Sequence, residues 1–119
     1  MPISTRPTPL PLDVRRAVLA VLIRARRGPL HIAEIVRRTK HDSGLDLATL
    51  PGVQPEQRVS DILRHQARYQ RAKAIGRGVY LLDIAAFSES TRWRCLHWQH
   101  IAAKRGPYSR YIVRYRGEP

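Results

Sequence analysis

The chain has little cysteine, no long hydrophobic run and no recognisable export signal. Cys95 is its single cysteine, which excludes an internal disulfide and fits a reducing compartment. The longest uninterrupted apolar run, residues 17–23, is far too short to span a bilayer. The opening residues MPISTRPTPLPLD carry four prolines and lack the apolar core of a secretory signal. We therefore expect a soluble cytoplasmic protein with no membrane partner and a flexible N-terminal arm at residues 1–11.

Acidic residues are also scarce: 9 Asp+Glu face 22 Lys+Arg, which leaves a formal charge of +13. Lysine contributes little to this excess, and arginine pairs with phosphate more specifically than lysine does. The excess is regional, because residues 31–53 carry three basic and three acidic side chains, whereas residues 54–80 carry six basic and two acidic ones. This distribution favours a nucleic-acid partner, with a membrane surface or an acidic protein as the alternatives.

Apolar residues at helical spacing predict three helices in the first half of the chain, over residues 11–27, 31–39 and about 55–70. In the first helix, Leu19 and Ile23 lie well off the main apolar stripe. They predict a second apolar contact, either with the C-terminal part of the chain or with a second copy. Residues 41–54 have the composition of a loop, and the leucines within it suggest that this loop packs down.

The third helix has a polar face that is rich in arginine. Its apolar positions are Val59, Ile62 and Leu63, with Gln66 on the same side. The opposite face is predicted to carry Gln57, Asp61, Arg64, His65, Arg68 and Arg71. A solvated helix face without function is the alternative interpretation of such a strip.

Two short apolar runs follow this helix and meet at Gly76-Arg77-Gly78. Glycine adopts the positive φ that tight hairpin turns require, so the segment 71–82 is predicted to be a β-hairpin with Arg77 at its tip and Lys73 on its first strand. A helix followed at once by such a hairpin is the layout of a winged helix-turn-helix. The predicted fold is therefore α+β: three helices and a β-hairpin wing over residues 12–83, with a basic C-terminal extension, a helix and then a strand or arm, over residues 84–119.

Three local motifs occur in order along this region. They are GPLHIAEI from Gly28, GVQPEQRV from Gly52 and AIGRGVYLL from Ala74. Together they resemble the HARE-type helix-turn-helix domain, which is found in chromatin and restriction-associated proteins and in the delta subunit of bacterial RNA polymerase. Gln54 departs from the family pattern, which prefers a threonine cap at that position. The resemblance implies DNA binding or, as in the delta subunit, contact with RNA polymerase or another transcription protein.

The arginine-rich face favours DNA, which predicts a transcriptional regulator or a protein of the nucleoid. With the third helix in a major groove, Gln57 would pair with adenine, Arg64 with guanine, and Asp61 with cytosine or with an arginine. His65 belongs to the same predicted interface. The side chains expected to hold phosphates are Arg58, Arg68, Arg71, Lys73 and Arg77.

Residues 84–119 lie outside the resemblance. A helix capped near Ser88 or Ser90 is predicted to present two apolar faces, one against the first helix and one toward a further contact such as a dimer partner. The candidate dimer or partner contacts are Leu19, Ile23, Trp93 and Trp98. The terminal YSRYIVRYRG alternates aromatic and basic residues, which favours a strand or a basic arm and leaves RNA or single-strand binding as an alternative.

Metal binding and catalysis find little support in the sequence. Cys95, His97 and His100 are close in sequence, but Cys95 points away from the two histidines on a helix, and no second ligand pair completes a zinc site. No nucleophile elbow, phosphate-binding glycine loop or HExxH motif is present. We therefore expect no enzyme activity, no metal and no cofactor.

Overall fold

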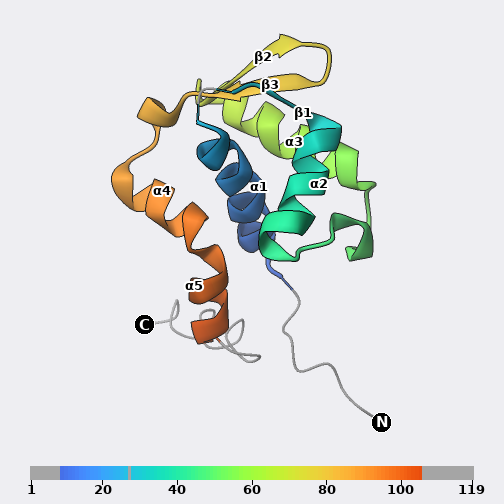
Figure 1. The fold of residues 1–119 in the computed structure, drawn as a ribbon, viewed down its shortest axis with the longest axis vertical. Coiled ribbons are helices and arrows are strands. Elements are labelled where there is room, and N and C mark those ends of the chain that lie inside the picture. Colours follow the sequence, from blue (N-terminus) through green and yellow to red (C-terminus); the bar gives the residue numbers. More distant parts are fainter. Residues whose placement is uncertain (1–8, 27, 106–119) are drawn as a thin grey trace.

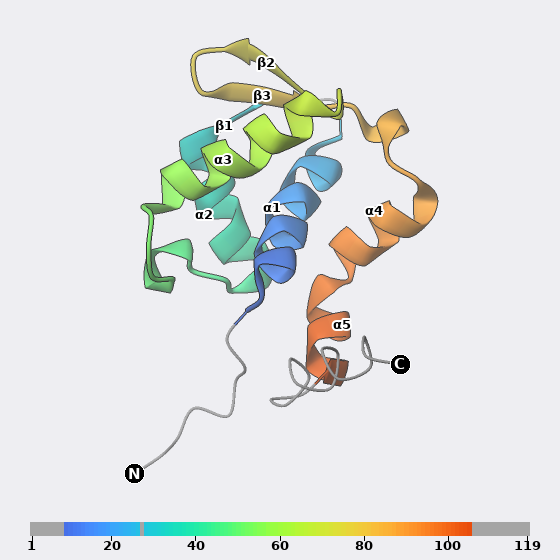
Figure 2. The same ribbon diagram turned by 180° about the vertical axis from the view of Figure 1, so that it is seen from behind.

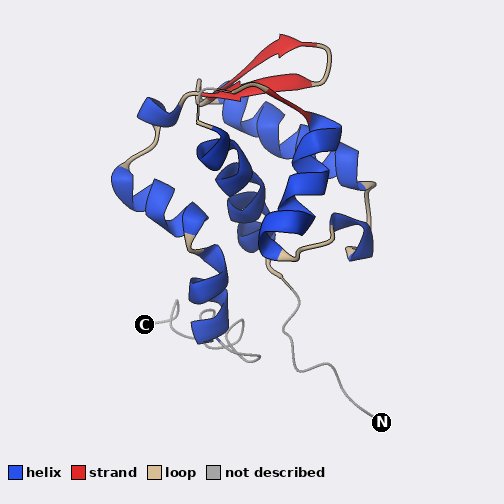
Figure 3. Ribbon diagram, in the orientation of Figure 1, coloured by secondary structure: helices blue, strands red, loops and turns tan. Residues whose placement is uncertain are grey.

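The computed structural model describes residues 9–26 and 28–105, and within them it is α+β (Figure 1). Five α-helices and a three-stranded antiparallel sheet account for most of these residues (Figure 3). In chain order the elements are α1 (Pro11–Ala25), β1 (Leu30–His31), α2 (Ile32–Ser43), α3 (Pro55–Arg68), β2 (Ala72–Gly76), β3 (Val79–Leu82), α4 (Glu89–Leu96) and α5 (Trp98–Arg105). The α+β class predicted from the sequence is thereby confirmed.

Helix α1 forms the centre of the fold. Figure 1 shows it between α2 on one side and α4 and α5 on the other, and it contacts all three. Because neighbours lie on both sides, its side chains are buried over almost the whole circumference, including every residue from Ala17 to Ile23. Pro11 occupies the first turn, where its missing N–H costs nothing, and the Asp13 carboxylate accepts a hydrogen bond from the Leu10 backbone N–H at 2.9 Å.

The core consists of apolar side chains from several helices and from the sheet. Val18 and Leu22 of α1 meet Ile35 of α2 and Val59 and Leu63 of α3, and all five are almost inaccessible to solvent. Burying a side chain of this size contributes about 1.5–3 kcal/mol. Leu45 and Leu47 from the loop after α2 join this cluster, which confirms that the loop packs down.

The sheet has the order β1-β3-β2. Strand β3 pairs antiparallel with β1, aligning Leu30 with Tyr80, and with β2, aligning Lys73 with Leu81. The predicted hairpin is thus present, with Arg77 and Gly78 as its turn. Only Gly78 of the two flanking glycines has a positive φ, of 70°.

The C-terminal ends of α1 and α2 differ from the sequence prediction. Helix α1 stops at Ala25 rather than Arg27, because Arg26 takes a positive φ. Helix α2 continues to Ser43 rather than ending at Thr39, because Gly44 adopts the left-handed conformation that caps a helix, with φ 74°. The hydroxyl of Ser43 donates to the Thr39 carbonyl at 2.7 Å, so it finds a partner within the helix.

The C-terminal helix predicted as one element is two. Ser88 caps α4 as expected, accepting a hydrogen bond from the Thr91 backbone N–H at 3.1 Å. The helix then breaks at His97, where the backbone angles are φ −113° and ψ 25°. This break redirects α5, in which the Gln99 amide donates a hydrogen bond to the Ser43 carbonyl at the end of α2. None of the described helices is long and apolar enough to cross a bilayer.

Candidate nucleic-acid interface

Helix α3 presents one continuous polar stripe to solvent. Gln57, Asp61, Arg64 and Arg68 recur at spacings of three and four residues and are all exposed, as the helical period requires. Figure 2 shows α3 on the viewer's side of the molecule, in front of α2 and below the sheet. The four side chains therefore share a face of α3 that is exposed to solvent.

Hydrogen bonds organise the N-terminal half of this stripe. The Asp61 carboxylate accepts from the Gln57 amide at 2.8 Å and from the Arg64 guanidinium at 3.4 Å. Arg64 also donates to the Ser60 hydroxyl at 3.1 Å. Asp61 therefore orients the two side chains that were predicted to read bases, while Arg68 extends the stripe without an acidic partner among the described residues.

The β2–β3 hairpin continues the positive charge beyond α3. Strand β2 packs against α3, and both Lys73 on this strand and Arg77 at the turn are exposed. Neither forms an ion pair with any residue that the structure describes. We refer to the exposed basic residues of these two elements, Arg64, Arg68, Lys73 and Arg77, as the α3–hairpin surface.

Two of the predicted phosphate contacts do not belong to this surface. The Arg58 guanidinium donates to the Pro51 carbonyl at 2.7 Å and is half-buried, so it holds the turn that leads into α3. Arg71 was expected on the polar face of the third helix, but α3 ends at Arg68 and Gln70 takes a positive φ. The chain turns there, and the Arg71 guanidinium carbon lies 5.4 Å from the centre of the Phe87 ring.

His65 lies at the border of the predicted interface. Its ring is exposed and packs edge to face on Tyr69, with the ring centres 5.2 Å apart. It also lines a cleft between α1, α3 and α4, to which Arg15, Arg16 and Arg94 contribute. The sequence prediction did not single out these three arginines. No local pattern marks them, because α1 and α4 bring them together only in the folded chain.

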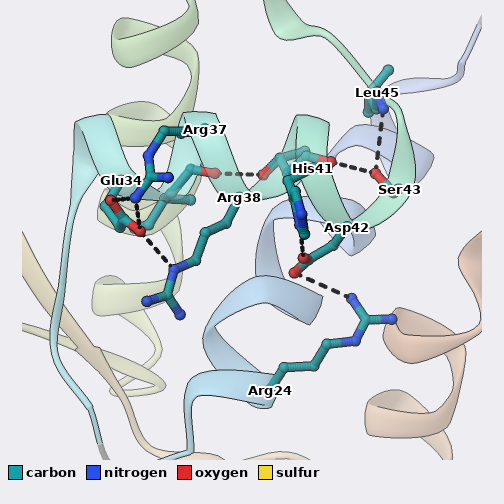
Figure 4. A network of polar contacts seen from close by, with 10 residues as sticks. Arg24, Glu34, Arg37, Arg38, His41, Asp42, Ser43 and Leu45 are labelled. Atoms are coloured by element: carbon teal, nitrogen blue, oxygen red, sulfur yellow. Dashed lines mark hydrogen bonds and ion pairs between the residues drawn. The ribbon is translucent and has the colours of Figure 1, made fainter.

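By contrast, the arginines of α2 are paired within their own helix. The Glu34 carboxylate accepts hydrogen bonds from Arg37 and from Arg38, the latter at 2.8 Å (Figure 4). These bonds, from Arg37 first and Arg38 second, lower the pKa of Glu34 from 4.5 to about 2. At the far end of α2, Asp42 lies 4.0 Å from the Arg24 guanidinium of α1 (Figure 4). The basic residues of α2 are thus partly neutralised, as Arg64 is by Asp61, whereas Arg68, Lys73 and Arg77 have no acidic partner among the described residues.

Three of the four candidate dimer or partner contacts are not available to a partner. Leu19, Ile23 and Trp98 are buried in the core that α1 shares with the C-terminal helices. The second apolar contact of the first helix is therefore made by the C-terminal part of the same chain. Trp93 is 51% exposed and lies against His97, with ring centres 4.6 Å apart.

The remaining predictions concern the C-terminal residues. The thiol of Cys95 is buried, whereas His97 and His100 are exposed, so these three side chains do not converge. No group of three or more metal-ligating side chains occurs within the described ranges. The predicted strand or basic arm at YSRYIVRYRG lies outside the described residues.

Comparison of the chain with protein-family models, with curated proteins and with solved structures finds no match in any of the three.

Proposed function

We propose that the protein is a winged helix that binds double-stranded DNA, with α3 in the major groove and the β2–β3 hairpin as a wing on the phosphate backbone. The order of elements supports this proposal. Helices α1, α2 and α3 precede the hairpin, and β1 completes a sheet of order β1-β3-β2. The resemblance of the three sequence motifs to HARE-type domains supports the same arrangement.

The observation that carries the proposal is the lack of acidic partners for three basic side chains of the α3–hairpin surface. Arg68, Lys73 and Arg77 are exposed and have no acidic partner among the described residues. The arginines of α2, by contrast, are paired with Glu34. Within the described residues, Arg68 on α3 and Lys73 and Arg77 on the adjacent hairpin are therefore unpaired cations that a duplex backbone would attract.

The hydrogen-bond chain on α3 gives the proposed base contacts a physical basis. Because Asp61 holds both Gln57 and Arg64, their side chains lose less freedom when they meet a base edge. In this arrangement Gln57 faces adenine, Arg64 faces guanine, and Arg68, Lys73 and Arg77 hold phosphates. A role in transcription regulation or in the nucleoid follows from such binding.

The alternative is a protein-interaction module that docks on RNA polymerase or on another acidic protein. It would use apolar contacts, and the burial of Leu19, Ile23 and Trp98 removes most of the candidates for them. DNA binding is therefore the better-supported function.

The test is the affinity of the full chain for a labelled random-sequence duplex as the salt concentration rises. Phosphate contacts predict a linear fall of log affinity with log salt, and the three proposed contacts of Arg68, Lys73 and Arg77 predict a slope of about −3. Absence of binding at low salt would exclude the proposal. Selection from a random pool would then show whether the protein prefers a sequence.

A further inference from the structure

A cleft of about 240 Å³ opens between α1, the C-terminal half of α3 and α4. Arg15 and Arg16 of α1 line it, together with Arg71 after α3 and Arg94 of α4. His65 and Gln66 form the α3 side. None of the described residues that line the cleft carries a carboxylate. Four arginines from three separate segments therefore share one concave space.

The buried thiol of Cys95 lies in the wall of the cleft, among these arginines. Burial raises its pKa, and Arg16, Arg15 and Arg94 each act in the opposite direction. Three guanidinium groups from two helices thus exert their electrostatic effect on one sulfur atom in the wall of the cleft. Such a field attracts an anion into the same space.

Two further side chains indicate that the cleft is shaped for a ligand. The Arg71 guanidinium carbon lies 5.4 Å from the Phe87 ring centre, a cation–π contact that restrains this side chain at the cleft. Gln66 is only 2% exposed, and its amide oxygen has no hydrogen-bond partner. An unpaired buried acceptor is uncommon in folded proteins, and a protonated ligand oxygen would satisfy it.

We propose that this cleft binds a phosphate group, either inorganic phosphate or the phosphate of a small phosphomonoester. The planar guanidinium group matches the geometry of phosphate oxygens, and a protonated phosphate oxygen would donate to Gln66. The volume is below the roughly 300–1,000 Å³ of sites for drug-sized ligands, so the cleft suits a small phosphate compound. The proposal does not depend on DNA binding by the α3–hairpin surface.

The test titrates the full chain with sodium phosphate at constant ionic strength and follows backbone amide NMR signals. We expect a saturable shift at Gln66, Thr91 and Arg94. The double variant Arg15→Gln/Arg94→Gln should weaken the affinity at least tenfold. The control variant Arg37→Gln/Arg38→Gln removes the same charge from α2 and should bind phosphate as the wild type does.

Thermal unfolding provides a second measurement that also checks the folding of the variants. Phosphate should raise the melting temperature of the wild type and of the control variant, but not that of Arg15→Gln/Arg94→Gln. The proposal is overturned if phosphate gives no saturable shift, or if the cleft variant and the control respond equally.

A duplex competition experiment identifies the source of the phosphate. If phosphate and a short duplex bind together, and the cleft variant keeps its duplex affinity, the ligand is a free small phosphate compound. If the duplex displaces phosphate and the cleft variant shows a smaller salt slope for duplex binding, the cleft holds a backbone phosphate of DNA. The first result supports the proposal, and the second overturns it, because a DNA phosphodiester has no protonated oxygen to donate to Gln66. The titration without DNA stands even if no duplex binds.

Discussion

The imidazole ring of His31 lies directly against Gly78 at the turn of the hairpin. A Cβ atom at Gly78 would be 3.1 Å from His31 Nε2. The Gly78 carbonyl also accepts a hydrogen bond from the Ile32 backbone N–H at 2.8 Å, at the start of α2. The position of the hairpin relative to α2 therefore depends on the absence of a side chain at residue 78.

The first prediction is that Gly78→Ala lowers the free energy of unfolding. The residue has a φ of 70°, and forcing an alanine into the left-handed region costs roughly 1–2 kcal/mol before the contact with His31 is counted. Gly76→Ala is the control, because a Cβ there would meet its nearest neighbour at 3.6 Å and no positive φ is required. Chemical denaturation of the two variants should separate them, and equal stabilities would contradict the assigned turn.

The second prediction concerns the unpaired cations of the α3–hairpin surface. Arg68→Gln and Arg77→Gln should each reduce the slope of log affinity against log salt by about 1, because each removes one phosphate contact. Lys104→Gln removes the same charge from the exposed surface of α5 and should leave the slope unchanged. An equal effect of all three substitutions would indicate attraction by net charge alone rather than by this surface.

The third prediction tests whether Leu19 belongs to the core that α1 forms with the C-terminal helices or to a dimer interface. Leu19 is 3% exposed, and Leu19→Ala should cost about 2–5 kcal/mol because it leaves a cavity. Trp93→Ala should change stability by less than about 0.5 kcal/mol, as exposed positions usually do. Denaturation combined with light scattering checks both expectations. A loss of dimers without a loss of stability in Leu19→Ala would refute the assignment of Leu19 to the core.

The helices could be predicted from sequence because their apolar residues recur at a helical period. Val59, Leu63 and Gln66 are buried on the side of α3 that the pattern indicated. The position of Arg71 could not be predicted, because the turn before it depends on a positive φ at Gln70, a residue type that rarely adopts one. The extension of α2 was also missed, since His41, Asp42 and Ser43 have the composition of a loop.

The cleft is a second feature that could not be predicted from the sequence. Arg15, Arg71 and Arg94 lie far apart along the chain, and only the packing of α4 on α1 brings them together. The same packing decides between the two alternatives that the sequence left open for Leu19 and Ile23, the C-terminal part of the chain or a second copy. A single sequence showed that these residues needed apolar neighbours, but not which of the two supplies them.

The fourth prediction distinguishes two arginines of α3. Arg58 holds the Pro51 carbonyl, so Arg58→Ala should lower stability by about 1 kcal/mol and leave the salt slope of duplex binding unchanged. Arg64 is exposed and makes contacts only on the helix surface, so Arg64→Ala should leave stability unchanged and instead weaken binding to the preferred site by about 1–3 kcal/mol through the lost base contact. Denaturation and duplex titration of both variants check this. A reduced salt slope in Arg58→Ala would return that residue to the DNA-binding set.

The last prediction follows from the ion pairs of Glu34. Its pKa is lowered from 4.5 to about 2 by hydrogen bonds from Arg37 and Arg38, so the folded state favours the ionised carboxylate. A lowered pKa stabilises the folded state fully above pH 4.5, and this contribution disappears as the pH falls toward 2. The stability difference between the wild type and Glu34→Gln should therefore be largest above pH 4.5 and shrink below it. Because Glu34 lies on the surface, salt should also reduce the difference.

NMR titration of the Glu34 carboxyl carbon in the Arg37→Gln/Arg38→Gln variant should show its pKa returning toward 4.5. A difference that stays constant down to pH 2 would show that the two arginines do not stabilise the folded state through this carboxylate.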